Sequence, residues 1–212
     1  MYEKYGQFID GKWHKSSSGE TYEVINPANE EIIGKASKAS SEDVDKALLS
    51  AQKGLEVWKK TPPWQRAYIL RRIADKMREK QDILAKWMTL EVGKPFAEAK
   101  GEVNGAADIY EWNAEETKRI YGQTVESRFE DTRVHVYYQP VGVVAALVPW
   151  NFPLVLSARK ISTALAAGCS VIVKPDVITP GVVMEQVEIC RECGVPPGVV
   201  NLLSGDPPSI AQ

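Results

Sequence analysis

The chain has 212 residues, of which 44% are hydrophobic and 25% are charged, so it is long enough for one sizeable core and has the composition of a globular protein. Lys and Arg total 26 against 28 Asp and Glu, and the net charge of -2 excludes a broad cationic surface for nucleic acid. The first residues are polar and the longest apolar stretch, 141–148, is too short to span a bilayer, so we expect a cytoplasmic protein that contacts no membrane.

The first half of the chain predicts short strands followed by helices. Asp10 and Gly11 lie between two apolar-bearing segments and both tolerate a positive φ angle, which predicts a tight hairpin. Ser40 or Ser41 can cap a helix, and apolar residues then recur at helical spacing. The expected elements are a hairpin over 7–13, strands over 21–25 and 31–37, and helices over 42–58, 63–93 and 96–120. Together they form a helical layer preceded by a small antiparallel ribbon.

The second half predicts alternating strands and helices. Residues 133–139 alternate in polarity and could form an exposed arm, whereas 141–148 is almost continuously apolar, as in a parallel strand covered on both faces. A helix, a strand, a helix and a strand are then expected over 154–167, 170–173, 179–193 and 199–203. The predicted fold class is therefore α/β, in which the helical layer is followed by the first βαβαβ half of a doubly wound, Rossmann-like parallel sheet.

Two unusual side chains follow the first two strands of this unit. In an open parallel sheet, ligands bind beyond the carboxyl ends of the strands, and these ends are followed by Asn151 and Lys174. A neutral amide can stabilise a developing oxyanion, and a cation beside it can hold a ribose or a phosphate, so the pair predicts a dinucleotide enzyme. The spacing leaves equally open that Asn151 caps the next helix and that Lys174 is a solvated lysine.

The motifs around these residues resemble the aldehyde dehydrogenase superfamily. In chain order they are Pro149-Trp150-Asn151-Phe152-Pro153, Ala164-Leu165-Ala166-Ala167-Gly168, Lys174-Pro175 and Thr179-Pro180. Supporting matches lie at 9–13, 25–28, Trp58, Arg66, 91–95, 140–143 and 194–198. The order and spacing of the motifs, rather than any single one, carry the resemblance.

The resemblance implies an NAD(P)-dependent oxidation of an aldehyde substrate to a carboxylic acid through a thiohemiacetal. Asn151 matches the superfamily's catalytic asparagine, whose side chain helps to bind the oxyanion. Pro149, Trp150 and Asn151 match positions along the nicotinamide side of the cofactor, and Lys174 matches the lysine that contacts the adenosine ribose.

One departure from the superfamily pattern bears on the choice of cofactor. The superfamily often has a glutamate three residues after this lysine, where it binds the ribose 2′-hydroxyl, but this chain has Val177. A valine cannot make that hydrogen bond and does not repel a 2′-phosphate. With Val177 at the cofactor site, we expect NADP to be used at least comparably to NAD.

Glu91 is a candidate metal ligand on the same resemblance. The superfamily can hold a monovalent cation with a carboxylate at this position and with backbone carbonyls, here those near Val24 and Ile25. Oxygen ligands suit such hard cations. The alternative is that Glu91 is a solvated carboxylate on a helix.

The chain divides into three predicted parts. Residues 1–123 form the N-terminal helical part of the cofactor-binding domain, 124–140 an oligomerisation arm, and 141–212 the first half of the Rossmann-like domain. The arm matches part of the segment through which the superfamily's subunits pair, which implies a homo-oligomer.

The resemblance also implies groups that this sequence does not contain. Members of the superfamily are much longer, and their nucleophilic cysteine and glutamate base have no counterpart before Gln212. We therefore expect the 212-residue chain to be inactive alone, with a non-catalytic nucleotide-binding or assembly module as the alternative. We also expect the strand over 199–203 to expose an unpaired edge.

Overall fold

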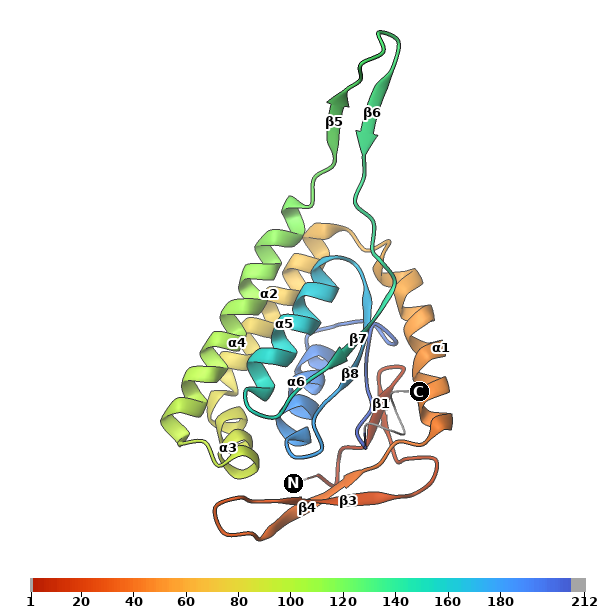
Figure 1. Cartoon of the computed structure of the whole chain (residues 1–212). Coiled ribbons are helices and arrows are strands. Elements are labelled where there is room, and N and C mark those ends of the chain that lie inside the picture. Colours follow the sequence, from red (N-terminus) through yellow and green to blue (C-terminus); the bar gives the residue numbers. More distant parts are fainter. Residues whose placement is uncertain (1, 207–212) are drawn as a thin grey trace.

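The structure is a computed structural model that describes residues 2–206, and a five-stranded sheet lies at its centre (Figure 1). In spatial order the strands are β2 (Lys12–His14), β1 (Gln7–Ile9), β9 (Val200–Leu202), β8 (Ser170–Lys174) and β7 (Val143–Leu147). β7, β8 and β9 are parallel and are joined by helices α5 (Pro153–Ala166) and α6 (Pro180–Glu192). The predicted βαβαβ unit is confirmed.

The N-terminal hairpin is also confirmed, but it belongs to the central sheet. Asp10 and Gly11 have φ angles of 51° and 77° and connect β1 to β2. β1 runs antiparallel to β9, with Phe8 opposite Leu202. The expectation of an unpaired edge at the strand over 199–203 is therefore wrong, because an antiparallel neighbour needs no crossover and the distant hairpin pairs there. Among the described parallel strands, the unpaired edge lies at β7 instead.

A buried glutamine joins the hairpin to the end of β9. The Gln7 amide oxygen accepts a hydrogen bond from the Ser204 backbone N–H at 2.7 Å, and the Gln7 amide nitrogen donates to the Ser204 carbonyl at 3.2 Å. The same nitrogen donates to the Ser37 carbonyl at 3.1 Å. One side chain thus satisfies backbone groups of two segments that are far apart in the sequence.

Helices cover both faces of the sheet. α1 (Ser41–Trp58) lies on one face, and α5 and α6 lie on the other (Figure 1). An outer layer packs on α5 and α6 and consists of α2 (Pro63–Glu79), α3 (Gln81–Val92) and α4 (Phe96–Glu116), after which a short 3-10 helix covers Thr117–Arg119. Ser40 caps α1 as expected. The predicted helix over 63–93 is two helices, because the backbone leaves the helical conformation at Lys80, where φ is -94° and ψ is 18°.

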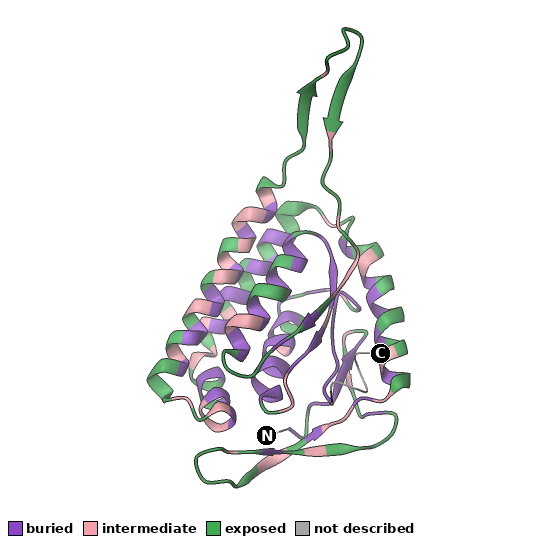
Figure 2. Ribbon diagram, viewed as in Figure 1, coloured by how far each residue is buried: buried purple, intermediate pink, exposed green. Residues whose placement is uncertain are grey.

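Two small ribbons complete the fold. β3 (Thr21–Ile25) and β4 (Ile32–Ser37) form one, while β5 (Gln123–Glu126) and β6 (Arg133–Val136) form an arm that projects from the body and is exposed along its length (Figures 1 and 2). The division of the chain at residues 123 and 140 stays a prediction, although β1 and β2 join the sheet of the second half. Within residues 2–206, no helix is long and apolar enough to cross a membrane.

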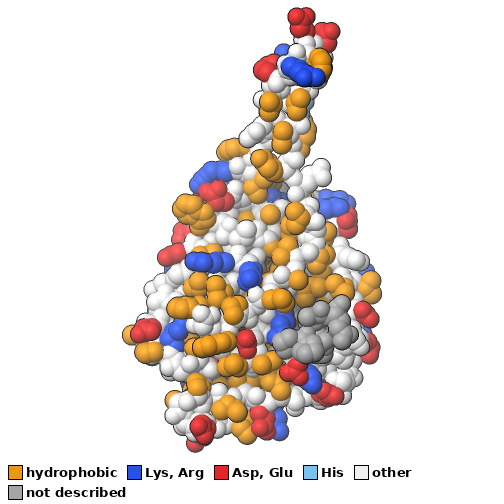
Figure 3. Space-filling model, viewed as in Figure 1, with side chains coloured by type: hydrophobic (Ala, Val, Ile, Leu, Met, Phe, Trp, Pro, Cys, Tyr) orange, Lys and Arg blue, Asp and Glu red, His pale blue; other side chains and the backbone are white. Residues whose placement is uncertain are grey.

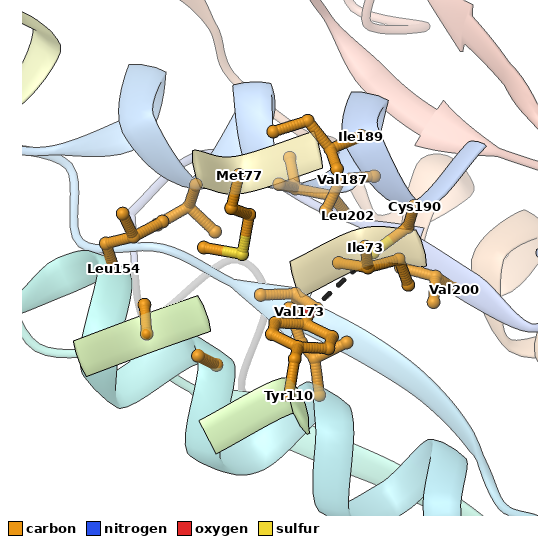
Figure 4. Close-up of a cluster of buried hydrophobic side chains, with 14 of the residues drawn as sticks. Ile73, Met77, Tyr110, Leu154, Val173, Val187, Ile189, Cys190, Val200 and Leu202 are labelled. Atoms are coloured by element: carbon orange, nitrogen blue, oxygen red, sulfur yellow. Dashed lines mark hydrogen bonds between the residues drawn. The ribbon is translucent and has the colours of Figure 1, made fainter. Parts of the chain in front are cut away.

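The main core lies between the sheet and the helices that cover it (Figure 2). Figure 4 shows buried side chains of α2, α4, α5, α6, β8 and β9 meeting there. Trp58 on α1 is also fully buried, and its indole N–H donates to the Leu165 carbonyl at 2.8 Å. The core thus joins helices of the first half of the chain to strands of the second.

Two helical glycines provide a matched test of the packing between α1 and the sheet. A Cβ added to Gly54 on α1 would lie 2.2 Å from the carbonyl carbon of Gly198, whereas one added to Gly101 on α4 would meet nothing within 4 Å. Gly54→Ala is therefore expected to lower the free energy of unfolding by about 1–3 kcal/mol through overpacking. Gly101→Ala should raise it by roughly 0.4–1 kcal/mol, because alanine favours the helix and restricts the unfolded chain.

Urea unfolding of the two variants beside the parent chain measures both effects. Opposite signs are expected, and stabilisation of equal size in both variants would contradict the close contact between α1 and the segment before β9.

Candidate active site

The two predicted site segments lie side by side at one edge of the sheet. Leu147, the last residue of β7, is opposite Lys174, the last residue of β8. The pairing continues one residue further, because the Val148 backbone N–H donates to the Lys174 carbonyl at 3.0 Å. The turn that carries Asn151 and the turn that follows Lys174 therefore start from neighbouring strand ends, as the sequence predicted.

The side chain of Asn151 is exposed and does not cap α5. The helix begins at Pro153, its N-cap residue is Phe152, and no side chain of its own turn caps it. The alternative in which Asn151 caps the helix is therefore wrong. Pro149 and Trp150 are exposed beside Asn151, and half of the Trp150 surface is accessible. The turn thus presents an amide, an indole and a proline ring outward from the strand end.

Asn151 borders a surface pocket of about 510 Å³ between α4 and α5. The residues that line this pocket are Lys94, Glu98, Gly101, Glu102, Gly105, Asn151, Phe152, Val155, Leu156 and Arg159. Sequence reasoning missed Arg159, which lies on α5 eight residues after Asn151. Within residues 2–206, Arg159 forms no ion pair. The pocket therefore contains an amide at one position and an exposed guanidinium at another.

A buried carboxylate from α4 caps the helix that follows Asn151. One oxygen of Glu102 accepts hydrogen bonds from the backbone N–H groups of Leu154 and Val155, at 3.0 and 3.1 Å. Its other oxygen forms an ion pair with Lys94. The first N–H groups of a helix lack internal partners, and a negative charge is favoured beside them. Sequence reasoning missed Glu102 because the backbone N–H groups that it accepts from lie more than 50 residues away.

Glu91 has the same role at the start of α6. Its Oε1 accepts from the Gly181 N–H at 2.6 Å and from the Tyr2 hydroxyl at 2.5 Å, and its Oε2 accepts from the Val182 N–H at 3.1 Å. Glu91 is fully buried, so the alternative of a solvated helix carboxylate is wrong. Burial raises the pKa of Glu91 to about 7, although all three donors act in the opposite direction.

The cation site stays a prediction. Val24 and Ile25 belong to β3, which pairs with β4, and Val24 is buried. Both carboxylate oxygens of Glu91 accept hydrogen bonds from donors of the protein. These hydrogen bonds support a capping role for this carboxylate and supply no evidence for a bound cation.

Lys174 is buried at the strand end rather than solvated. Only 9% of its surface is accessible, and burial lowers the pKa of its ammonium group, against the opposing charges of Asp176 and Asp206. Within residues 2–206, the Lys174 ammonium forms no ion pair. Val177 is half-buried in the turn between β8 and α6. The turn after β8 therefore offers a cation and an apolar side chain.

The three cysteines lie in the interior of the fold. Cys169, Cys190 and Cys193 are all buried. Burial raises the pKa of Cys190 to about 12, and its thiol lies 3.7 Å from the Tyr110 hydroxyl in the core shown in Figure 4. Because the thiolate is the reactive form of cysteine, this shift disfavours a reaction at Cys190. Cys193 packs in the same core.

The raised pKa of Glu91 predicts that stability falls as the pH rises. An unfolded glutamate loses its proton near its ordinary value of 4.5, whereas folded Glu91 keeps its proton to about pH 7. The folded state therefore binds the extra proton in this window, and the free energy of unfolding should decrease by about 3 kcal/mol across it. Urea unfolding at about pH 5, 6 and 7 measures the slope.

Glu91→Gln should flatten this slope, because the titrating group is gone. It should also lower stability by about 1–3 kcal/mol, because its amide nitrogen would face the Val182 N–H. Glu98→Gln, which removes an exposed carboxylate of α4, serves as the control. A slope that Glu91→Gln leaves unchanged would contradict the assignment of this titration to Glu91.

Comparisons with known proteins place this geometry in a family. The model of the aldehyde dehydrogenase family matches residues 13–212. The chain is 44% identical over 198 residues to a glutarate-semialdehyde dehydrogenase of Pseudomonas aeruginosa, and the match covers 93% of this chain and 41% of that relative. It is 44% identical over 197 residues to the succinate-semialdehyde dehydrogenase [NADP(+)] GabD of Escherichia coli, with coverage of 93% and 41%.

A solved structure shows the same fold. The crystal structure of an E. coli NADP dependent enzyme superimposes with a TM-score of 0.95 at 42% identity, and the match covers 97% of this chain and 43% of that chain. The chain thus spans about two fifths of the length of the relatives that it matches. The match over residues 13–212 and the shared fold show that the chain belongs to the aldehyde dehydrogenase family.

Proposed function

We propose that this chain forms the part of an NAD(P)-dependent aldehyde dehydrogenase that binds the cofactor and one side of the oxyanion. The observation that carries the proposal is the position of Asn151: its amide is not used as a helix cap, and it borders the pocket directly beyond the end of β7. An amide donor placed where an oxyanion develops stabilises the transition state of acyl transfer. In the complete enzyme, an aldehyde is oxidised to a carboxylic acid through a thiohemiacetal.

The residues at the two strand ends fit a dinucleotide. Lys174 is a buried cation with no ion pair among the described residues, and Pro149 and Trp150 are exposed after the end of the neighbouring strand β7. Lys174 and Val177 would hold the adenosine ribose, and Pro149, Trp150 and Asn151 would line the nicotinamide side. The nicotinamide, when bound, supplies a hydride acceptor. Val177 neither binds a 2′-hydroxyl nor repels a 2′-phosphate, so we propose that both NAD and NADP are used.

The complete enzyme is expected to depend on Asn151. Asn151→Ala should lower kcat by roughly 10²–10³, the effect of deleting one oxyanion-hole donor, while the affinity for NAD or NADP changes much less. Formation of NADH or NADPH from an aldehyde measures this. The control is Asn104→Ala, which removes an exposed amide of α4 that bonds to Gln81.

The same assay tests the assignment of a missing nucleophile. The 212-residue chain alone should not turn over, because a nucleophile and a base are needed beside the oxyanion donor. Turnover by this chain that alkylation of its cysteines abolishes would overturn the assignment of a missing nucleophile. A complete enzyme that Asn151→Ala leaves fully active would remove Asn151 from the catalytic site.

The pocket also supports a substrate class. Two of the relatives are named for glutarate semialdehyde and succinate semialdehyde, both of which carry a carboxylate at the end remote from the aldehyde. Arg159 lies in the same pocket as Asn151 and has no ion pair among the described residues. A guanidinium binds a carboxylate with two parallel hydrogen bonds. We therefore propose aldehydes with a distal acidic group as substrates.

Replacing Arg159 should discriminate between acidic and neutral aldehydes. Arg159→Leu is expected to raise KM for succinate semialdehyde by about 10- to 100-fold, the range of a lost charge-assisted hydrogen bond, and to leave KM for butanal nearly unchanged. Lys160→Leu removes the exposed charge of the next residue on α5, which does not line the pocket, and is the matched control. An equal rise in KM for both aldehydes would contradict the substrate class.

The arm supports self-association of the complete enzyme. An isolated two-stranded ribbon is marginally stable in water. The side chains of Val125, Val134, Tyr137 and Tyr138 are nevertheless exposed on or beside it, and Figure 3 shows apolar side chains along the arm. We propose that another copy of the chain covers these residues in a homo-oligomer.

A further inference from the structure

The backbone at Asn151 and in the residues that follow it is held by one ion pair from the helical layer. The Lys94 ammonium donates to the Asn151 carbonyl at 3.3 Å and lies 3.9 Å from the centre of the Phe152 ring. Its partner Glu102 accepts from the N–H groups of Leu154 and Val155, three and four residues after Asn151. Two charged side chains therefore fix the turn on which the oxyanion-binding amide stands.

Both members of the pair are held rigidly. Their side chains are 9% and 2% exposed, for Lys94 and Glu102 respectively. Lys94 lies in the link between α3 and α4, where Gly93 has a φ angle of 75° and Pro95 is the N-cap residue of α4. Pro95 has a restricted φ angle, and a Cβ at Gly93 would lie 3.1 Å from the Pro27 ring. The ammonium group thus approaches the turn from a backbone with little freedom.

The turn has few other restraints among the described residues. Hydrogen bonding between β7 and β8 ends at Val148, and no side chain within the turn caps α5. Pro149 and Pro153 have no backbone N–H to donate. Asn151 would otherwise be free to shift by distances that matter to catalysis, since misplacement of a reacting group by about 1 Å can cost about 100-fold in rate.

We propose that Lys94 and Glu102 are positioning residues for Asn151. They do not contact the aldehyde carbon; they hold the Asn151 backbone so that its amide points at the developing oxyanion. The ion pair matters because each member satisfies the other: the carboxylate caps α5 while the ammonium neutralises it and contacts the Asn151 carbonyl. This inference rests on the proposed function and assigns to the helical layer a part in the same reaction.

A double-mutant cycle in the complete enzyme tests the proposal. Lys94→Met keeps the aliphatic chain and removes the ammonium, and it should lower kcat by about tenfold with little change in KM for the aldehyde. In the Asn151→Ala background the same substitution should change kcat by less than about twofold, because the amide that it positions is absent. Lys94→Arg, which restores a cation, should recover most of the loss.

A second variant guards against a general loss of structure. Glu102→Gln keeps an amide oxygen that can accept from Leu154 and Val155 and removes only the charge that pairs with Lys94, so it should reproduce the coupling to Asn151. Lys100→Met is the matched control. Lys100 lies on α4, and its ammonium likewise forms an ion pair, with Asp82, and lies 5.6 Å from the centre of an aromatic ring, that of Phe96. It should leave kcat and the coupling unchanged.

The outcomes separate this inference from the proposed function. If Asn151→Ala retains the parent kcat, the catalytic role of Asn151 fails and the positioning role fails with it. If Asn151→Ala loses activity but Lys94→Met and Glu102→Gln reduce kcat by the same factor with and without Asn151, the pair acts only on the fold and the inference is overturned. Unchanged kcat in both variants overturns it as well.

Discussion

Two helices that start at the candidate site, α5 and α6, begin at prolines and carry no capping side chain of their own. Their first N–H groups would lack partners in a buried setting, which is costly. Glu102 on α4 and Glu91 on α3 supply the missing acceptors. Every other feature of the site depends on this arrangement, because the turns after β7 and β8 end where these helices start.

The helical layer is therefore part of the site. The two caps balance their charge differently: Glu102 has the Lys94 ammonium beside it, whereas among residues 2–206 the donors to Glu91 are the neutral Tyr2 hydroxyl and backbone N–H groups. Burial raises the pKa of Glu91 to about 7.

Local signals in the sequence predicted the local structure well. The Asp10-Gly11 turn, the cap of α1 at Ser40 and the strand ends before Asn151 and Lys174 all follow from neighbouring residues. Contacts between distant segments could not be predicted in this way. Pairing of β1 with β9 depends on three-dimensional closure, and a glutamate in a helix gives no local sign that it will cap another helix 50 or 90 residues later.

The candidate site shows the same limit. Motif resemblance identified Asn151 and Lys174, and the structure brings their strand ends together. The structure also excludes the two alternatives considered for these residues: Asn151 does not cap α5, and Lys174 is buried rather than solvated. Arg159 lines the same pocket as Asn151, but no local signal identified it, and Lys94 and Glu102 likewise needed the packing of α4 on α5 to be known.

Pairing of the first described strand, β1, with the last, β9, has a consequence for synthesis on the ribosome. Phe8 pairs with Leu202, and Gln7 exchanges hydrogen bonds with Ser204. At a synthesis rate of about 5–20 residues per second, the N-terminal hairpin leaves the ribosome roughly 10–40 s before its partner strand exists. During that interval its unpaired edge and the Phe8 ring have no native neighbour in β9, which makes the nascent hairpin a segment that a chaperone would be expected to shield.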